Sequence, residues 1–195
     1  AARLLFSEME DNRMRVILAE KPSVAQSIAA VLGANQKKNG YLQGENDLVS
    51  WCIGHLIELA PPEIYDARYA KWRREDLPIV PSAWESVVSD GTKKQFAVLK
   101  DLLNRTDVDE VVCATDAGRE GELIFRMVYE KTGCTKRVKR LWISSLEESA
   151  IREGFRSLKP GTAYDALYRA ALCRAQADWL VGINGTRLYS RLYGT

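Results

Sequence analysis

Two stretches of the chain combine the residue types that bind metal and phosphate. Glu20 is followed by Lys21, and in a later stretch Asp116 and Glu120 enclose Arg119. Carboxylate oxygens are the ligands that Mg²⁺ prefers, and the ion takes one or two of them together with water and phosphate. Crowded carboxylates repel one another, so one of them can hold a proton and act as a general acid. The lysine and the arginine add positive charge for a phosphodiester, so the sequence predicts a metal–phosphate site.

The acidic residues follow predicted strands. Residues 15–19 (RVILA) and 110–115 (EVVCAT) are short β-branched runs typical of buried strands, and 138–143 is a third. Strands and helices alternate along this part of the chain, which predicts an α/β fold with a parallel sheet flanked by helices on both faces. Sites in such sheets lie at the carboxyl ends of the strands, where both Glu20 and Asp116 are expected.

Helices are predicted between these strands from apolar residues at helical spacing. The predicted helices cover residues 23–32, 93–104 and 123–133, and a fourth opens at Ser145, runs through Phe155 and stops before Pro160. The first and the last begin with the signature of a capping box, Ser23 with Gln26 and Ser145 with Glu148. These signatures predict where each helix starts.

The middle and the end of the chain depart from this alternation. Glycines and prolines between residues 39 and 81 surround a predicted strand at 48–53, so we expect an irregular insertion between α/β elements there. The stretch 162–195 is rich in alanine and arginine and is predicted to be helical. Basic residues cluster at 68–74 and at 131–140, and each cluster is either a solvated face or part of a nucleic-acid groove.

Each of these signals also has a plainer explanation. A Glu-Lys pair at a strand end is often only the solvated start of a loop, and acids at the start of a helix balance its dipole. The sole histidine, His55, would by the same reasoning be a structural hydrogen-bonding residue, and its functional alternatives are phosphate contact or orientation of an acid. Two corners of one sheet that each pair acid with base favour the metal–phosphate site.

Composition restricts the function classes. The 195 residues carry a formal net charge of +2, which excludes a strongly basic histone-like protein but leaves room for a local basic groove. No apolar run is long enough to span a membrane and no signal-peptide core is present, so we expect no membrane partner. The four cysteines are too scattered for a zinc or redox pair, which favours the reducing cytoplasm.

Four segments together match a known pattern. They are 19–23 (AEKPS), 54–56 (GHL), 115–122 (TDAGREGE) and 174–187 (RAQADWLVGINGTR). In combination they resemble the toprim domain of type IA DNA topoisomerases, and the last segment resembles the topoisomerase III branch. The resemblance implies a Rossmann-like toprim domain over 14–145 and the incomplete start of a helical DNA-groove domain over 146–195. Residues 1–13 are expected to be an extension outside the fold.

The resemblance also implies roles for individual residues. Glu20 matches the general acid toward the leaving 3′ hydroxyl, Lys21 matches the residue that positions the scissile phosphate, and Glu20, Asp116 and Glu120 match the ligands of Mg²⁺. The implied DNA-binding positions are Lys21, His55, Arg119, Arg174, Asp178 and Arg187. Gly118 replaces the middle acid of the family motif, which predicts weaker metal binding or greater reliance on water and phosphate.

The implied activity is that of an ATP-independent isomerase, which cleaves and religates single-stranded DNA to change DNA topology. No tyrosine lies in a motif that resembles the family's nucleophile, so we expect this chain to be inactive by itself and to work with the rest of a topoisomerase chain. Single-stranded DNA is the expected partner, RNA is a second candidate, and the nucleoid in the cytoplasm is the expected location. The alternatives are another toprim enzyme, such as a primase or nuclease, and a non-catalytic nucleic-acid-binding toprim module.

Overall fold

Four parallel strands form the centre of a seven-stranded sheet with the order β2-β3-β4-β1-β7-β8-β9. The structure is a computed structural model that describes residues 13–194, so the expected N-terminal extension lies, apart from Arg13, outside the described residues. The parallel strands are β4 (Asp47–Trp51), β1 (Met14–Ala19), β7 (Val108–Ala114) and β8 (Arg137–Arg140). Short antiparallel strands extend both edges: β2 (Gln36–Lys38), β3 (Tyr41–Gln43) and β9 (Lys159–Pro160).

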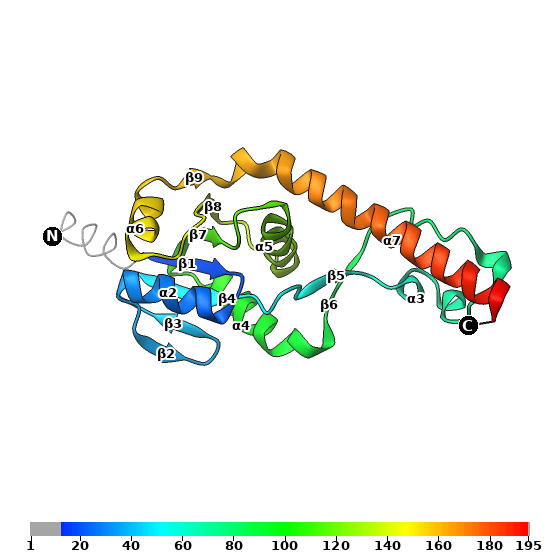
Figure 1. Ribbon diagram of the computed structural model, residues 1–195. Helices are drawn as coiled ribbons and strands as arrows, with labels where there is room; N and C mark the ends of the chain where they lie inside the picture. Colours follow the sequence, from blue (N-terminus) through cyan, green and yellow to red (C-terminus); the bar gives the residue numbers. More distant parts are fainter. Residues whose placement is uncertain (1–12, 195) are drawn as a thin grey trace.

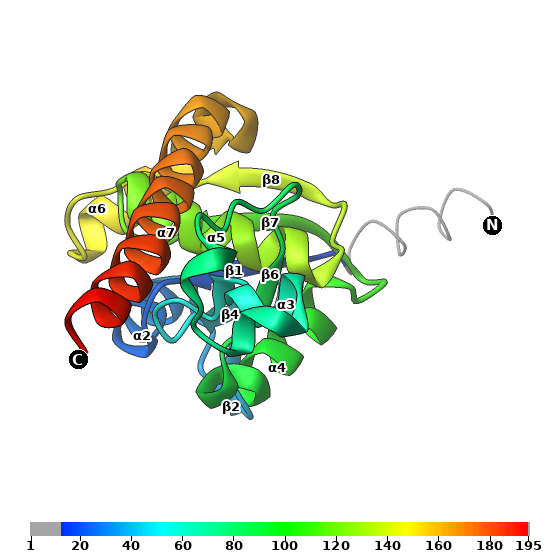
Figure 2. The same ribbon diagram turned by 90° about the vertical axis from the view of Figure 1, so that its right-hand side faces the viewer.

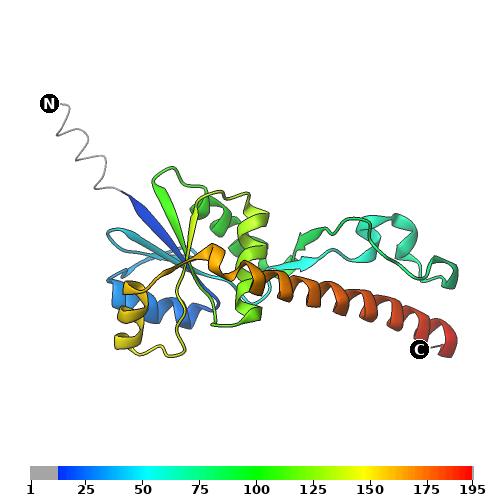
Figure 3. The same cartoon turned by 90° about the horizontal axis from the view of Figure 1, so that it is seen from above.

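Two pairs of helices cover the two faces of this sheet (Figures 1 and 3). They are α2 (Pro22–Leu32) with α6 (Glu148–Arg156) on one face, and α4 (Lys93–Leu103) with α5 (Arg119–Thr132) on the other. Side chains alternate along β1, so Val16 and Leu18 pack in the core under α4 and α5, whereas Ile17 and Ala19 pack in the core under α2 and α6. Burial on both faces explains why β1 is a continuous apolar run. The predicted α/β fold, a sheet with a parallel centre flanked by helices, is confirmed.

Both capping-box predictions are wrong. Helix α2 begins one residue earlier than predicted, with Lys21 at the N-cap and Pro22 in the first turn. Proline suits that position because its ring fixes φ in the helical range and it has no N–H to leave unpaired. At α6 the N-cap is Glu147, and the Ser145 hydroxyl accepts a hydrogen bond from the Glu147 N–H at 3.2 Å ahead of the helix.

The segment expected to be an irregular insertion divides into two parts. Its first part joins the sheet, because β2 and β3 pair as a hairpin and β4 is a central parallel strand close to the predicted 48–53. Its second part forms, with the residues that follow it, an arm over residues 57–88 that extends from the sheet (Figure 1). The arm is a two-stranded ribbon with short helices at its tip: β5 (Ile57–Leu59), β6 (Ser86–Val88), α3 (Pro62–Tyr65) and the 3₁₀ turns Ala67–Ala70 and Arg74–Asp76.

Helix α7 (Asp165–Tyr193) is a single 29-residue helix that begins beside the sheet and continues along the arm (Figures 1 and 2). The Trp179 Nε1–H donates to the carbonyl of Ala60 at 3.0 Å. The Asn184 amide makes two hydrogen bonds to the backbone of Ile79, accepting from its N–H at 2.6 Å and donating to its carbonyl at 2.9 Å. The helix therefore holds the arm in place. Within residues 13–194, no helix combines the length and apolar character needed to cross a membrane.

Candidate functional site

The carboxyl ends of β1 and β7 form a switch point in the chain topology. The two strands are neighbours, with Ala19 opposite Ala114. After β1 the chain crosses one face through α2 to strands on one side of the sheet, and after β7 it crosses the other face through α5 to β8 on the other side. The connections diverge here, and such a switch point is the usual ligand position in open α/β sheets. Glu20 directly follows β1, and Asp116 lies two residues beyond β7.

Glu20, Lys21 and Asp116 meet at this switch point. The backbone N–H of Asp116 donates to Glu20 Oε2 at 3.2 Å. Lys21 Nζ lies 3.8 Å from Glu20 Oε1 and 4.0 Å from Asp116 Oδ2. The Glu20 side chain is only 13% exposed, whereas the Asp116 carboxylate is 58% exposed. One sheltered acid, one exposed acid and a cation thus lie together at the ends of β1 and β7, as the sequence predicts. Glu20, Lys21 and Asp116 are called the acidic corner below.

The acid at the start of α5 takes a different partner. Glu120 Oε1 lies 2.8 Å from His55 Nε2, and both side chains are largely exposed. Among the described residues, no group of three or more histidines, cysteines, aspartates or glutamates gathers closely enough to hold a metal ion. The structure therefore brings together Glu20 and Asp116 but does not assemble the three predicted Mg²⁺ ligands around one point. Two carboxylates still fit the ordinary demand of Mg²⁺, which completes its shell with water and phosphate.

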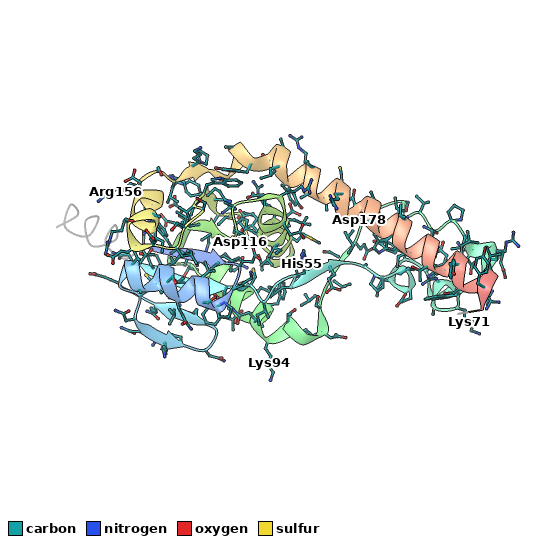
Figure 4. The ribbon with its side chains drawn as sticks, viewed as in Figure 1. His55, Lys71, Lys94, Asp116, Arg156 and Asp178 are labelled. Carbon is teal, nitrogen blue, oxygen red and sulfur yellow. The ribbon has the colours of Figure 1, made fainter. Side chains whose placement is uncertain are left out.

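A cleft lies between α5, α7 and the base of the arm, and the first turn of α5 lines it. It has a volume of about 310 Å³ and is lined by apolar side chains together with His55, Glu58, Arg119, Glu120, Arg174 and Asp178. In Figure 4, Asp116 lies beside the sheet, His55 lies near the base of the arm, and Asp178 lies on α7. Arg174 Nε lies 3.5 Å from Asp178 Oδ2, and both side chains are exposed. Trp179 packs edge-on against Tyr65 and Trp84, which gives that residue a packing role.

Arg187, a predicted DNA-binding residue, is only 5% exposed in this structure. Its Nη1 donates to the carbonyl of Tyr69 at 2.7 Å, and its guanidinium lies 5.2 Å from the centre of the Trp72 ring. Arg187 therefore fastens α7 to the arm.

Arg140 was missed by the sequence analysis, which counted it within the basic cluster 131–140. Its side chain is completely buried, and Nε donates to Glu122 Oε2 at 3.0 Å. Nη2 donates to the carbonyl of Asp116 at 2.8 Å, and Nη1 donates to the carbonyls of Cys113, Thr115 and Leu141. These bonds fix the backbone that carries Asp116. In the sequence Arg140 appears only as a charged residue beside an apolar run. Its partner acid, Glu122, lies on another element, so the pairing is not visible in the local sequence.

Gly121 is required by close packing in the same loop. A Cβ atom there would lie 2.9 Å from the backbone nitrogen of Asp116 and closer still to its carbonyl oxygen. The hydroxyl of Thr115 donates to the carbonyl of Gly121 at 2.8 Å, which closes the turn between β7 and α5. Gly118 differs, because its φ of 178° is extended backbone and nothing lies within 4 Å of a Cβ placed there.

The buried cysteines near the acidic corner are not nucleophiles. Cys52 and Cys113 are fully buried. Burial raises the pKa of the Cys113 thiol to about 11 and raises the pKa of Cys52 further. Both are therefore protonated thiols at neutral pH, and thiolate chemistry at this site is excluded for these two residues.

Comparison with known families agrees with this geometry. The profile of the Toprim domain matches residues 15–146. The chain belongs to the Toprim domain family. The match contains Glu20, Lys21 and Asp116, and it ends before α6. A likeness in fold alone extends further: full-length topoisomerase I from Thermotoga maritima superposes on 85% of this chain and 24% of its own, with a TM-score of 0.57 and 24% identity.

Similarity in sequence also continues beyond the Toprim domain. The chain is 55% identical over 175 residues to DNA topoisomerase 3 of Shouchella clausii, a match that covers 90% of this chain and 24% of that protein. DNA topoisomerase 3 of Staphylococcus epidermidis is 51% identical over 178 residues, covering 91% of this chain and 25% of its own length. The chain thus spans about a quarter of the length of these curated relatives.

Proposed function

We propose that this chain is the N-terminal part of a type IA DNA topoisomerase of the topoisomerase III branch, an ATP-independent isomerase that acts on single-stranded DNA with Mg²⁺. The observation that carries the proposal is the meeting of Glu20 with the Asp116 loop beside Lys21. The similarity to proteins named DNA topoisomerase 3 extends past the Toprim domain into α7, which supports this branch over a primase or a nuclease. This function implies that the protein acts on DNA in the cytoplasm.

The residues of the acidic corner have different roles. Glu20 is sheltered from bulk water and delivers a proton to the leaving 3′ oxygen, while Lys21 holds the scissile phosphate as a point charge. Glu20 and Asp116 would hold Mg²⁺, which supplies positive charge next to the phosphate. Glu120, paired with His55, contributes to that ion only if the pair opens. The nucleophilic tyrosine is supplied by the remainder of the topoisomerase.

The cleft provides the path for the nucleic acid. Arg119 and Arg174 are exposed on its walls and suit two phosphates of one strand, and His55 lines the same cleft. Asp178 holds the Arg174 side chain toward the cleft. RNA has the same phosphates and is the second candidate for this path.

The division of the chain at residues 145 and 146 remains a prediction. Helix α6 packs against α2, with Ile151 fully buried in the core of that face. This packing favours counting α6 with the first domain, so that the second domain starts near α7.

The test is binding of a fluorescent single-stranded oligonucleotide by the chain, measured by anisotropy while Mg²⁺ is titrated. We expect Mg²⁺ to tighten binding, and we expect Glu20→Gln and Asp116→Asn to raise the half-saturating Mg²⁺ concentration. In the full-length topoisomerase, Glu20→Gln should keep DNA binding but lose cleavage and religation. Relaxation of supercoiled DNA by the 195-residue chain alone, or binding that ignores both Mg²⁺ and these substitutions, would contradict the proposal.

A further inference from the structure

A buried carboxylate joins two arginines behind the acidic corner. The Glu122 side chain is 1% exposed. Its Oε2 accepts from Arg140 Nε at 3.0 Å, and its Oε1 accepts from Arg126 Nε at 3.0 Å. Both oxygens are thus occupied by charged donors from different elements, since Arg140 ends β8 and Arg126 lies one turn beyond Glu122 in α5.

Each arginine also binds a segment that contributes to the site. Arg140 donates to the carbonyl of Asp116 at 2.8 Å. Arg126 Nη2 donates to Asp165 Oδ1 at 2.8 Å and to the carbonyl of Gly161 at 2.7 Å. Asp165 is the first residue of α7, the helix whose next turns carry Arg174 and Asp178 into the cleft. A continuous relay of charge-assisted hydrogen bonds therefore runs from the Asp116 carbonyl through Arg140, Glu122 and Arg126 to Asp165.

We propose that Arg126 is a positioning residue that couples the start of α7 to the Asp116 loop, so that the acidic corner and the α7 wall of the cleft keep one relative geometry. This inference rests on the proposed function, because it assigns Arg126 a purpose in the same site. Arg126 touches none of the predicted site residues; it acts through Glu122 at one end and Asp165 at the other.

Loss of Arg126 has consequences at both ends of the relay. A planar guanidinium can serve Glu122, Asp165 and the Gly161 carbonyl together, whereas an ammonium is a single point of charge. Without it, Glu122 keeps a buried negative charge with half of its partners, and buried ion pairs are costly to break on one side. The carboxylate then shifts toward the remaining arginine, and Arg140 is the residue that holds Asp116.

The experiment compares three variants of the chain: Arg126→Gln, Arg126→Lys and Tyr168→Phe. The last is a matched control, because the Tyr168 hydroxyl makes another hydrogen bond between α7 and α5, to Glu130 Oε2 at 2.8 Å, outside the relay. The readouts are the half-saturating Mg²⁺ concentration in the oligonucleotide assay and amide hydrogen exchange, resolved for residues 114–118 and for the first turn of α7.

We expect Arg126→Gln to raise the half-saturating Mg²⁺ concentration about tenfold, the scale seen when residues behind metal ligands are replaced. Hydrogen exchange should quicken in both segments at once. Arg126→Lys keeps the positive charge and should fold even if the glutamine variant does not, yet it should still show both effects because the fork is lost. Tyr168→Phe should show faster exchange in α7 only.

Two outcomes would overturn the inference. Faster exchange at α7 with an unchanged Asp116 loop in both Arg126 variants would show that the relay transmits nothing. Equal effects from Tyr168→Phe would reduce Arg126 to general helix packing. Neither result touches the proposed function, which fails separately if the unaltered chain shows no Mg²⁺-dependent binding of single-stranded DNA.

Discussion

Glu20 and Asp116 lie 96 residues apart in the sequence, yet the backbone N–H of Asp116 donates to the Glu20 carboxylate at 3.2 Å. The hydrogen bond ties the loop after β7 to the end of β1. It also leaves the Asp116 carboxylate free to face solvent, where an ion and a phosphate can reach it. The geometry of this corner thus depends on the loop conformation from Asp116 to Gly121 as much as on the acids themselves.

A third carboxylate should strengthen the proposed metal site. Gly118 has extended backbone and open space around it, so Gly118→Asp introduces an acid without steric cost. We expect the half-saturating Mg²⁺ concentration to fall several-fold, because an added oxygen ligand and charge stabilise the ion. Gly118→Asn matches the size of the aspartate without its charge. Identical titrations for the two variants would show that the position does not face the ion.

Gly121 should tolerate no side chain. In Gly121→Ala the new methyl group overlaps the backbone of Asp116, so the loop must move. We expect the free energy of unfolding to fall by about 1–3 kcal/mol, as for overpacked sites, together with weaker Mg²⁺-dependent binding. Urea denaturation and the anisotropy assay measure the two effects. Gly118→Ala in the same loop is the control and should change the stability little, and an equal loss there would contradict the packing argument.

Two arginines of α7 should respond differently to removal. Arg174 is exposed on the cleft, so Arg174→Ala should reduce the slope of log affinity for single-stranded DNA against log salt by about 0.7, the value for one phosphate contact. Arg187 is buried against the arm, so Arg187→Ala should lower the free energy of unfolding by about 1–3 kcal/mol and leave the slope unchanged. A changed slope for Arg187→Ala would show that Arg187 contributes to DNA binding.

The stability of the chain should fall in alkaline solution partly through Cys113. Burial raises the pKa of this thiol from 9.0 to about 11 in the folded protein. Below pH 9 the thiol is protonated in both states, so its contribution to stability is fully present; between pH 9 and about 11 only the unfolded chain ionises, and the contribution is lost. Urea midpoints from pH 8 to pH 11 measure this loss. Cys113→Ala should show a shallower decline, and parallel curves would contradict the assignment.

The sheet was predictable because its signals are local. Strands β1 and β7 are largely buried on both faces and therefore appear as apolar runs, and Glu20 and Asp116 follow these runs directly. The helix starts were harder, since a proline at the first position of α2 outweighed the serine that follows it. The predicted fold class and the acidic corner thus follow from short-range patterns.

Long-range partners explain what the sequence did not show. Glu122 and Arg140 each look like surface charges, and only the folded sheet places them 3.0 Å apart in the core. Arg187 resembles a DNA-binding residue until the arm covers it. Glu120 and His55 form a pair that no spacing rule predicts, because the two residues come from different segments that meet at the cleft.

Helix α7 is anchored at two points, to Arg126 through Asp165 and to the backbone of Ile79 through Asn184, and these points lie about 28 Å apart along an α-helix. A force on the arm is therefore transmitted along the uninterrupted helix to Asp165, which the relay through Arg126 connects to the acidic corner. Gly182 and Gly185 flank the distal anchor and are the places where the helix bends most easily. Under the coupling proposed for Arg126, a movement of the arm that does not flex the helix at these glycines would pull on the loop that carries Asp116.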